Sequence, residues 1–498
     1  MAGLYVHLAT KNMAERDNNW IITLENFEAG FAPLAFTDSL TERGGGGHAS
    51  TMQNVDILDG KLTQGPGLAD LTNGTEAGVV TETIQYIMDK AVASDVTYAV
   101  GTSKLFKLSS TTVASGGTPS WPVSITSCTE GESIQVLKGN LYTFFNKSSG
   151  GDISKYDLSS TFDHDWGSTV PTGNAALQKA PHPSDKKEDI IAFGNGRYLG
   201  TYIAATNTLA PTKLDFGNDA EVADVIYNAN FWYIAVNSGV TGTNRTEGQI
   251  YLYDGSATET TLTDETGVGM QRIGFLYRIN GIIYVAYQDL SSTEGFIIGY
   301  IQGTQIKELR RFTGALPTFN QKTLYKGTIL FLSSGLVYSA GAMVDDLPFQ
   351  LSQIADGGHA TVGAIAAPFG TPMISSTDGV SAFRLAKFSG YATASNWKSI
   401  IMPVSGGKYK GFLDEVTVFT KSLGASARCD LIVEANQGAT SSTTKQITGT
   451  GKTRHYFTNF GLTQIEDLRV YLNFANGSAT NDCAIRKVIL SGHYVEST

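Results

Sequence analysis

The fold is decided by a stretch near the middle of the chain, where Ile190–Phe193 and Arg197–Tyr202 flank the turn Gly194-Asn195-Gly196. Both flanking runs are short and rich in β-branched and aromatic residues, a composition typical of strands. Gly and Asn tolerate positive φ angles, which two- and three-residue hairpin turns require. The stretch therefore predicts an antiparallel β-hairpin.

The same pattern occurs seven times along the chain, and helical periodicity is nearly absent. The paired runs are 96–100 with 105–108, 134–137 with 141–145, 190–193 with 197–202, 222–227 with 231–236, 273–277 with 282–287, 323–325 with 328–332, and 373–375 with 380–385. With turn centres at 102, 139, 195, 229, 280, 327 and 378, the spacings are 37, 56, 34, 51, 47 and 51 residues, with a mean of 46.

This mean spacing matches a β-propeller blade, which takes about 40–50 residues for four strands. Further strand candidates lie between the hairpins, at 250–253, 296–301 and 336–339. We therefore predict an all-β chain with a β-propeller of about seven blades over residues 51–400. Six or eight blades remain possible, and the uneven spacings keep open a pair of stacked sandwiches built from unrelated hairpins. Radial closure would leave only short strand edges.

The last hundred residues follow a different pattern, with strands of more regular length. Leu468, Val470 and Leu472 alternate with more polar neighbours, as in a sheet with one buried face. The segment 401–498 is therefore predicted to be a separate antiparallel β-sandwich that begins near Ser405-Gly406-Gly407. Its strands are expected at 412–420, 428–435, 453–457, 467–474 and 484–490.

The first fifty residues contain no clear repeat. The run Gly44–Gly47 cannot hold one conformation without external contacts. Residues 20–27 form a single apolar, strand-like stretch. We predict an extended N-terminal arm over residues 1–50 that docks on another surface.

The charge of the chain argues against a nucleic-acid-binding protein. It has 36 Lys and Arg against 46 Asp and Glu, a formal charge of −10, and no run of five or six like charges. Charged residues make up 16 %, below the roughly 25 % of an average domain, and hydrophobic residues make up 41 %. No apolar run is long enough to span a bilayer, and no secretion signal is recognisable at the start. We expect a globular protein that is synthesised in a cytoplasm.

The three cysteines, Cys128, Cys429 and Cys483, are too sparse for a disulfide-stapled scaffold. Cys429 and Cys483 both fall in predicted strands of the sandwich and could lie close together. A disulfide between them and a pair of buried thiols are both open, and buried thiols are the commoner arrangement.

One segment imitates a nucleotide site. Gly449-Thr450-Gly451-Lys452-Thr453 resembles the end of a phosphate-binding P-loop, but Gln446 stands where that motif needs its first glycine. The segment also precedes a predicted strand, whereas a P-loop opens a helix. A polar loop of the sandwich is the better interpretation.

Two other strings also fail as sites. Asp163-His164-Asp165 lacks further ligands at metal-site spacing. Ser376-Thr377-Asp378-Gly379 resembles the Asp-box turn of sialidases but lacks its spacing and its aromatic residue. A glycosidase would need two carboxylates about 5–10 Å apart, and the sequence does not pair any two of its acids. We assign no catalytic, cofactor-binding or metal-binding residue, and we expect no enzyme and no cofactor.

Three separated stretches resemble β-propeller structural proteins from the tails of tailed bacteriophages. The first leads into the propeller, the second matches the hairpin of the first blade, and the third lies in the domain that commonly follows the propeller. They comprise Ala49–Ile57 with Gly60–Leu68, Val96–Gly101 with Lys104–Leu108, and Gly411–Val416 with Ala484–Leu490. Together they cover roughly a third of the chain, and Met1–Asn18 has no counterpart.

The resemblance implies a non-enzymatic virion component that forms a ring of copies around the tail axis, as a nozzle, adaptor or tail-tip protein. Its other partners would be tail proteins. An alternative is a tail module that binds glycans on the host surface, since loops of propellers and sandwiches both bind ligands. A third hypothesis is a propeller enzyme that cleaves glycans.

Overall fold

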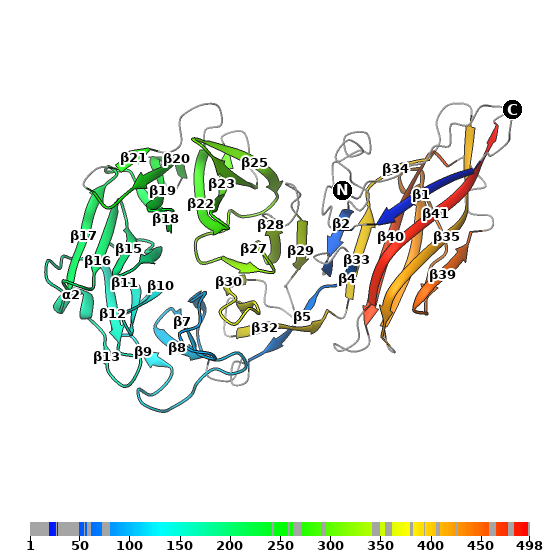
Figure 1. Cartoon of the computed structure of the whole chain (residues 1–498). Coiled ribbons are helices and arrows are strands. Elements are labelled where there is room, and N and C mark those ends of the chain that lie inside the picture. The colour runs from blue at the N-terminus through cyan, green and yellow to red at the C-terminus, as the bar shows by residue number, and fades with distance from the viewer. Residues whose placement is uncertain are drawn as a thin grey trace. The chain divides into compact units, whose positions relative to one another are not determined.

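The structure is a computed structural model, and it describes most of the chain (Figure 1). The described residues are 19–25, 27, 49–53, 55–56, 61–71, 80–241, 244–256, 259–261, 270–289, 295–340, 349–353, 361–378, 382–392, 394–404, 409–424, 427–457, 465–476 and 483–496. They belong to two compact units: residues 69–346 with 354–387, and residues 1–68 with 347–353 and 388–498. We call them the propeller unit and the sandwich unit.

Seven four-stranded antiparallel sheets follow one another along the chain. The first four are β6(Ile84–Ile87), β7(Thr97–Gly101), β8(Lys104–Leu108) and β9(Val123–Ser124); β10(Glu130–Leu137), β11(Asn140–Lys147), β12(Gly150–Tyr156) and β13(Phe162–Asp163); β14(Ser184–Lys187), β15(Ile190–Asn195), β16(Tyr198–Ile203) and β17(Thr208–Asp215); and β18(Glu221–Asn228), β19(Phe231–Thr241), β20(Asn244–Tyr253) and β21(Glu259–Thr261). One short helix, α2(Trp166–Thr169), follows β13.

Three further sheets complete the series. They are β22(Met270–Ile279), β23(Ile282–Asp289), β24(Phe296–Gln302) and β25(Gln305–Phe312); β26(Lys322–Tyr325), β27(Thr328–Ser333), β28(Leu336–Ala340) and β29(Phe349–Gln353); and β30(Thr361–Ala366), β31(Met373–Thr377), β32(Phe383–Tyr391) and β5(Pro66–Asp70). The outer strand of the last sheet thus comes from the N-terminal part of the chain. The Leu71 amide donates to the carbonyl of Leu385 at 3.1 Å, and Arg384 forms an ion pair with Asp70.

The sheets form a closed ring around a common axis. The first strand of each sheet, which we call the inner strand, packs against the inner strand of the next: β6 on β10, β10 on β14, β14 on β18, β18 on β22, and β26 on β30. Lys322 of β26 donates to the carbonyl of Leu276 on β22 at 2.6 Å, and β30 packs back on β6. The all-β propeller fold predicted from the hairpin pattern is therefore confirmed (Figure 1).

Each of the seven predicted hairpins falls in a different sheet. Four of them are the first hairpin of their sheet, beginning with β10, β18, β22 and β26, and three are the second, β7–β8, β15–β16 and β31–β32. The uneven spacing has this cause, because the pattern found the first hairpin in some sheets and the second in others. At first-hairpin turns the φ angles are positive, as at Lys138 and Gly139 or Asn280 and Gly281.

Apolar clusters between neighbouring sheets hold the ring together. Between the first two sheets, for example, Tyr98 and Leu105 pack with Phe145 and Tyr156. Middle strands are buried on both faces, as in β27, where every residue is buried, whereas the outer strand β25 is mostly exposed. Each such side chain contributes about 1.5–3 kcal/mol on burial.

The sandwich unit contains two antiparallel sheets. One has the order β3(Val55–Asp56), β4(Leu62–Gln64), β41(Cys483–Glu496), β35(Tyr409–Leu423) and β39(Gly451–Tyr456), with β1(Asn19–Glu25) also paired to β41. The other has the order β2(Ala49–Gln53), β33(Ala394–Ser399), β40(Asp467–Asn476), β36(Ala427–Ala435) and β37(Thr440–Ser441), with β34(Met402–Pro403) on β40 and β38(Lys445–Ile447) on β36. A 3-10 turn, η2(Asn436–Gly438), follows β36.

The predicted sandwich is present, with the predicted alternation: Leu468, Val470 and Leu472 are fully buried. Its extent differs from the prediction, because it also takes strands from outside residues 401–498. The N-terminal strand β1 pairs with β41 of its own chain, with Trp20 opposite Gly492. The predicted boundaries at residues 50 and 400 therefore differ from the bounds of the compact units. The strands β1, β2, β3, β4 and β33 join sheets whose other strands are distant in the sequence, and a local pattern does not show this. Gly44–Gly47, Ser405–Gly407 and Gly379 lie outside the described residues.

Candidate functional site

The axis of the propeller unit contains a cavity of about 440 Å³. All seven inner strands, or the residues directly beside them, contribute to its wall. The lining residues are Tyr86 to Val92, Ile134 to Val136, Ser184 to Lys186, Asp224 to Tyr227, Leu276 to Arg278, Phe319, Asn320, Lys322 and Ile365. The volume lies within the range of small-molecule sites, about 300–1,000 Å³. We take this axial cavity as the candidate site.

Two aspartates of the wall bridge neighbouring sheets. Asp224 of β18 accepts hydrogen bonds from the Leu276 amide of β22 at 2.7 Å and from the Val225 amide at 2.9 Å. Asp185 of β14 accepts from the Tyr227 amide of β18 at 2.8 Å and from the Lys186 amide at 2.8 Å. Each carboxylate therefore binds a backbone donor of the next sheet that would otherwise be unpaired on an inner strand.

Lys322 adds a buried ion pair to this arrangement. Its ammonium group contacts the Asp224 carboxylate, and the two side chains are 11 % and 4 % exposed. Burial raises the pKa of Asp224, and Lys322 opposes this rise. The pair links three consecutive sheets, because Lys322 lies on β26 and also binds the carbonyl of Leu276 on β22.

A third aspartate lies at the end of β6. Asp89 accepts a hydrogen bond from the Tyr277 hydroxyl at 3.1 Å, another from the Ala367 amide at 3.0 Å, and a third from the Thr323 hydroxyl. Burial raises the pKa of Asp89, and these hydrogen bonds lower it. Its donors come from the fifth, sixth and seventh sheets, so this residue also joins sheets across the axis.

Three further cations line the cavity, and we call the part of the wall that they form its mouth, because two of them are exposed to solvent. Lys90 and Arg278 are exposed, and Lys186 is half-buried. Lys186 donates to the carbonyl of Val136 and Arg278 to that of Tyr227. Burial and the nearby Lys90 lower the pKa of Lys186, which Asp185 opposes. The mouth thus carries positive charge on a chain whose formal charge is −10.

Two more buried polar residues lie outside the cavity lining: Glu132 on β10 of the second sheet, and His182 just before β14 of the third sheet. Glu132 accepts a hydrogen bond from Asn146 at 2.6 Å, and burial with the adjacent Glu130 raises its pKa to about 9. His182 is fully buried, its Nδ1 lies 2.8 Å from the carbonyl oxygen of Gly194, and burial lowers its pKa to about 4. Both groups are held in their neutral forms near pH 7.

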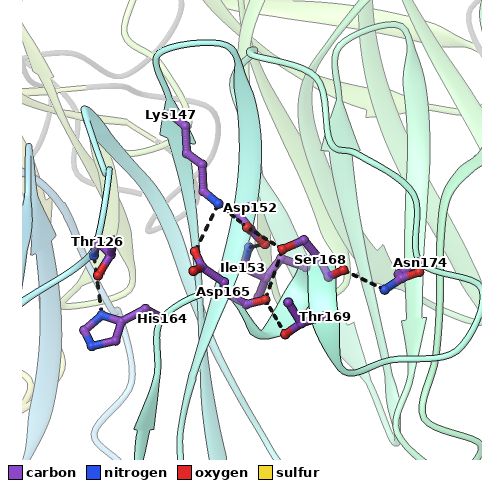
Figure 2. Close-up of polar contacts among 9 residues, drawn as sticks. All are labelled: Thr126, Lys147, Asp152, Ile153, His164, Asp165, Ser168, Thr169 and Asn174. Atoms are coloured by element: carbon purple, nitrogen blue, oxygen red, sulfur yellow. Dashed lines mark hydrogen bonds and ion pairs between the residues drawn. The ribbon is translucent and has the colours of Figure 1, made fainter.

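The Asp163-His164-Asp165 string does not form a cluster of ligands. Asp165 forms an ion pair with Lys147 at 3.0 Å, and Lys147 also contacts the buried Asp152 (Figure 2). His164 instead accepts a hydrogen bond from the Thr126 amide at 3.4 Å. Burial lowers the pKa of Lys147, but the hydrogen bonds to Asp152 and Asp165 outweigh this and raise it. The string therefore anchors the loop around α2.

The segment that resembles a P-loop belongs to the sandwich. Gly451 to Thr453 begin strand β39, and the Thr420 hydroxyl donates to the carbonyl of Gly449 at 2.8 Å. The segment thus leads into a strand, whereas a P-loop opens a helix that presents its amide groups to a phosphate. This agrees with the interpretation as a loop between strands.

Neither Asp378 nor the cysteine pair Cys429 and Cys483 lines the cavity. Asp378 accepts a hydrogen bond from the Ala382 amide at 2.9 Å, so it closes the turn between β31 and β32. Cys429 and Cys483 are free, fully buried thiols. Burial and a hydrogen bond with Cys483 raise the pKa of Cys429. The expected closeness of the two cysteines is confirmed, with reduced thiols in this structure.

Sequence reasoning assigned no residue of the axial cavity. One signal is available: Asp224 interrupts the otherwise apolar run 222–227, which is predicted to be a strand of a hairpin. A charged residue in such a strand needs a partner. The sequence gives no indication that this partner is Lys322, two sheets further along.

No protein-family model and no curated protein matches this sequence. Among solved structures, the chain is similar to the extracellular domain of a putative one-component system from B. thetaiotaomicron, at 12 % identity and a TM-score of 0.42, over 70 % of this chain and 44 % of that one. This chain thus spans less than half of that domain.

Two other similar structures are covered almost completely. An exo-β-1,3-galactanase from Phanerochaete chrysosporium matches at 10 % identity and a TM-score of 0.32, over 65 % of this chain and 98 % of that one. The CNH domain of AfRom2 matches at 10 % identity and a TM-score of 0.42, over 66 % of this chain and 100 % of that one. Likenesses this distant assign no function to this chain. Among the described residues, no helix is long and apolar enough to cross a membrane.

Proposed function

We propose that this protein is a non-enzymatic structural component of a bacteriophage virion, a tail protein that forms a ring from copies of itself. One observation supports the non-enzymatic part most strongly. Asp89, Asp185 and Asp224 each bind groups of other sheets, through backbone amides, hydroxyls or Lys322. A glycosidase instead needs one carboxyl group that protonates the leaving group and a second that attacks or activates water.

The tail assignment is supported by the resemblance of Ala49–Ile57 and Gly60–Leu68 to phage tail propellers. In this chain these segments supply β2, β3 and β4 to the two sandwich sheets and most of β5 to the seventh four-stranded sheet. A segment with this double role is strongly constrained by the fold. Its sequence is therefore a specific marker of a propeller joined to a sandwich.

Assembly is also supported by apolar side chains at equivalent turns. Phe231, Ile282 and Leu324 are 40 %, 40 % and 42 % exposed, and each lies beside the turn between the first two strands of its sheet. These turns lie at one end of the ring in the fourth, fifth and sixth sheets. Exposed apolar groups in such a series favour contact with another protein.

Electron microscopy of the purified protein, with mass photometry, tests this proposal. We expect particles of several copies with rotational symmetry, and we expect the protein in mature virions after synthesis in the host cytoplasm. A monomer at every concentration, together with absence from virions, would contradict the proposal. Incubation with host polysaccharide should leave its chain length unchanged.

A second candidate function is binding of host-surface glycans, and the axial cavity favours it. The cavity combines aromatic walls with polar groups, as small-molecule sites do. Purified protein should then block adsorption of phage to host cells. Adsorption that is unaffected by saturating protein would exclude this function.

A further inference from the structure

The positive charge at the mouth of the axial cavity is not neutralised by ion pairs. Within the described residues, Lys90, Lys186 and Arg278 form no ion pair with a carboxylate, and Lys186 and Arg278 donate hydrogen bonds to backbone carbonyls. Lys90 and Lys186 are near enough for Lys90 to lower the pKa of Lys186. Asp185 opposes this effect. The lining as a whole holds four cations, Lys90, Lys186, Arg278 and Lys322, against the three aspartates Asp89, Asp185 and Asp224, and this excess of one positive charge favours a bound monoanion.

The wall of the cavity also offers hydrogen-bond acceptors. Asp185 and Asp89 both line it, and each carboxylate oxygen has more than one acceptor position. Asp185 accepts from the Lys186 amide on one oxygen and from the Tyr227 amide on the other. Both carboxyl groups therefore have capacity left for hydroxyl groups of a ligand.

Two aromatic rings complete the wall. Tyr86 and Phe319 both line the cavity, with ring centroids 6.4 Å apart. Such rings provide apolar surface for the C–H faces of a ligand. A polyphosphate would place several negative charges beside the carboxylates of Asp89 and Asp185, which would repel it. A ligand with one carboxylate and several hydroxyl groups fits better, because its carboxylate can bind the cations and its hydroxyl groups can donate to the two aspartates.

We propose that the axial cavity binds a sugar acid, with the carboxylate at Lys90, Lys186 and Arg278 and the hydroxyl groups toward Asp89 and Asp185. The cavity of about 440 Å³ is large enough for a small-molecule ligand of this kind. This inference rests on the cavity alone and is independent of the tail role, so a failure of either leaves the other standing.

Calorimetric titration of the full-length protein with glucuronate tests the proposal. Glucose serves as the neutral probe and acetate as the anion without hydroxyl groups. We expect glucuronate to bind at least about tenfold more tightly than either probe, because only glucuronate uses both parts of the site. Lys90→Ala and Arg278→Ala should each weaken glucuronate binding about tenfold, and both side chains are exposed, so folding should be unaffected.

The matched control is Lys138→Ala, which removes an exposed lysine at a turn outside the cavity lining. It should leave glucuronate binding unchanged. The proposal is overturned if glucuronate does not bind to the wild type, if acetate binds as tightly, or if Lys138→Ala weakens binding as much as Lys90→Ala. Thermal melting of each variant checks that the fold is retained.

Discussion

The two units of this molecule are closed in different ways. In the propeller unit, six of the seven sheets are built from strands that are consecutive in the chain, and polar groups on the axis join each sheet to its neighbours. In the sandwich unit, both sheets combine N-terminal and C-terminal strands, and most of the buried side chains are apolar. The sheets of the propeller are built from local hairpins, and polar side chains on the axis join one sheet to the next. The sheets of the sandwich are built from strands that are distant in sequence, and their pairing holds the two ends of the chain together.

The N-terminal segment is where these two kinds of closure meet. Strands β1 to β4 belong to sandwich sheets, and β5 supplies the fourth strand of the last propeller sheet. The two units should therefore lose stability to different extents when this segment, an axial carboxylate or a sandwich contact is altered.

Stepwise deletion should produce the largest effect. Removing residues 2–60 deletes β1, β2 and β3 but keeps β5, so we expect only the sandwich unit to lose stability. Removing residues 2–71 also deletes β5 and leaves the seventh sheet with an open edge, which favours aggregation. Peptide-resolved hydrogen exchange distinguishes the units. Unchanged protection of β30 to β32 in the longer deletion would contradict the role of β5.

Breaking one axial link should cost less. Asp224→Ala leaves Lys322 buried without its partner, and we expect a loss of about 3–5 kcal/mol in the free energy of unfolding of the propeller unit. Asp189→Ala, which removes the exposed ion pair to Lys138, is the control and should cost about 0–1 kcal/mol. Denaturant titration measures both. Equal losses would show that the axial pair does not hold the sheets.

A steric change in the sandwich should be smaller again. A Cβ atom at Gly492 would lie 1.9 Å from the carbonyl oxygen of Phe412 and 2.4 Å from the Trp20 ring, so Gly492→Ala should cost about 1–3 kcal/mol. At Gly449 the nearest atom, on Thr453, would be 3.8 Å away, and Gly449→Ala should stay within about 0.5 kcal/mol. Thermal unfolding of the pair checks this. If Gly492→Ala matches its control, β1 does not pack closely on β41.

A pH dependence should be confined to the propeller unit. Glu132 has a folded pKa of about 9 against an ordinary 4.5, so its contribution to stability is full below pH 4.5 and is lost as the pH rises through 9. His182, with a folded pKa of about 4, has the opposite sign and acts only below about pH 6.5. Between pH 7 and 9 the free energy of unfolding should therefore fall by at most about 1.4 kcal/mol per unit from Glu132. Glu132→Gln should remove this slope, and an unchanged slope would exclude Glu132 as its source.

The difference between local hairpins and strand pairs that are distant in sequence explains which parts of the fold the sequence could predict. Turn residues such as Gly139 and Gly281 act on their own neighbours, so hairpins and their number could be found without knowing the rest of the fold. The pairing of Trp20 with Gly492 depends on two ends of the chain meeting, and no local pattern encodes that. The N-terminal stretch was accordingly predicted as a strand but not placed in a sheet.

The candidate site was harder to predict for a related reason. Asp185 and Lys186 are adjacent in sequence, but their partners Tyr227 and Val136 belong to the sheets on either side. Which polar residues face the axis depends on the register of every inner strand. A charged residue within a buried run is the only part of this signal that the sequence carries.

Residue-resolved hydrogen exchange at the amides of Tyr227 and Leu276 tests most directly whether the axial carboxylates hold neighbouring sheets. The structure pairs these amides with Asp185 and Asp224. We predict exchange as slow as that of amides within the sheets, and faster exchange at Leu276 in Asp224→Ala. Rapid exchange at both amides in the wild-type protein would mean that the carboxylates are not bound to them, and would contradict the non-enzymatic account of the axis.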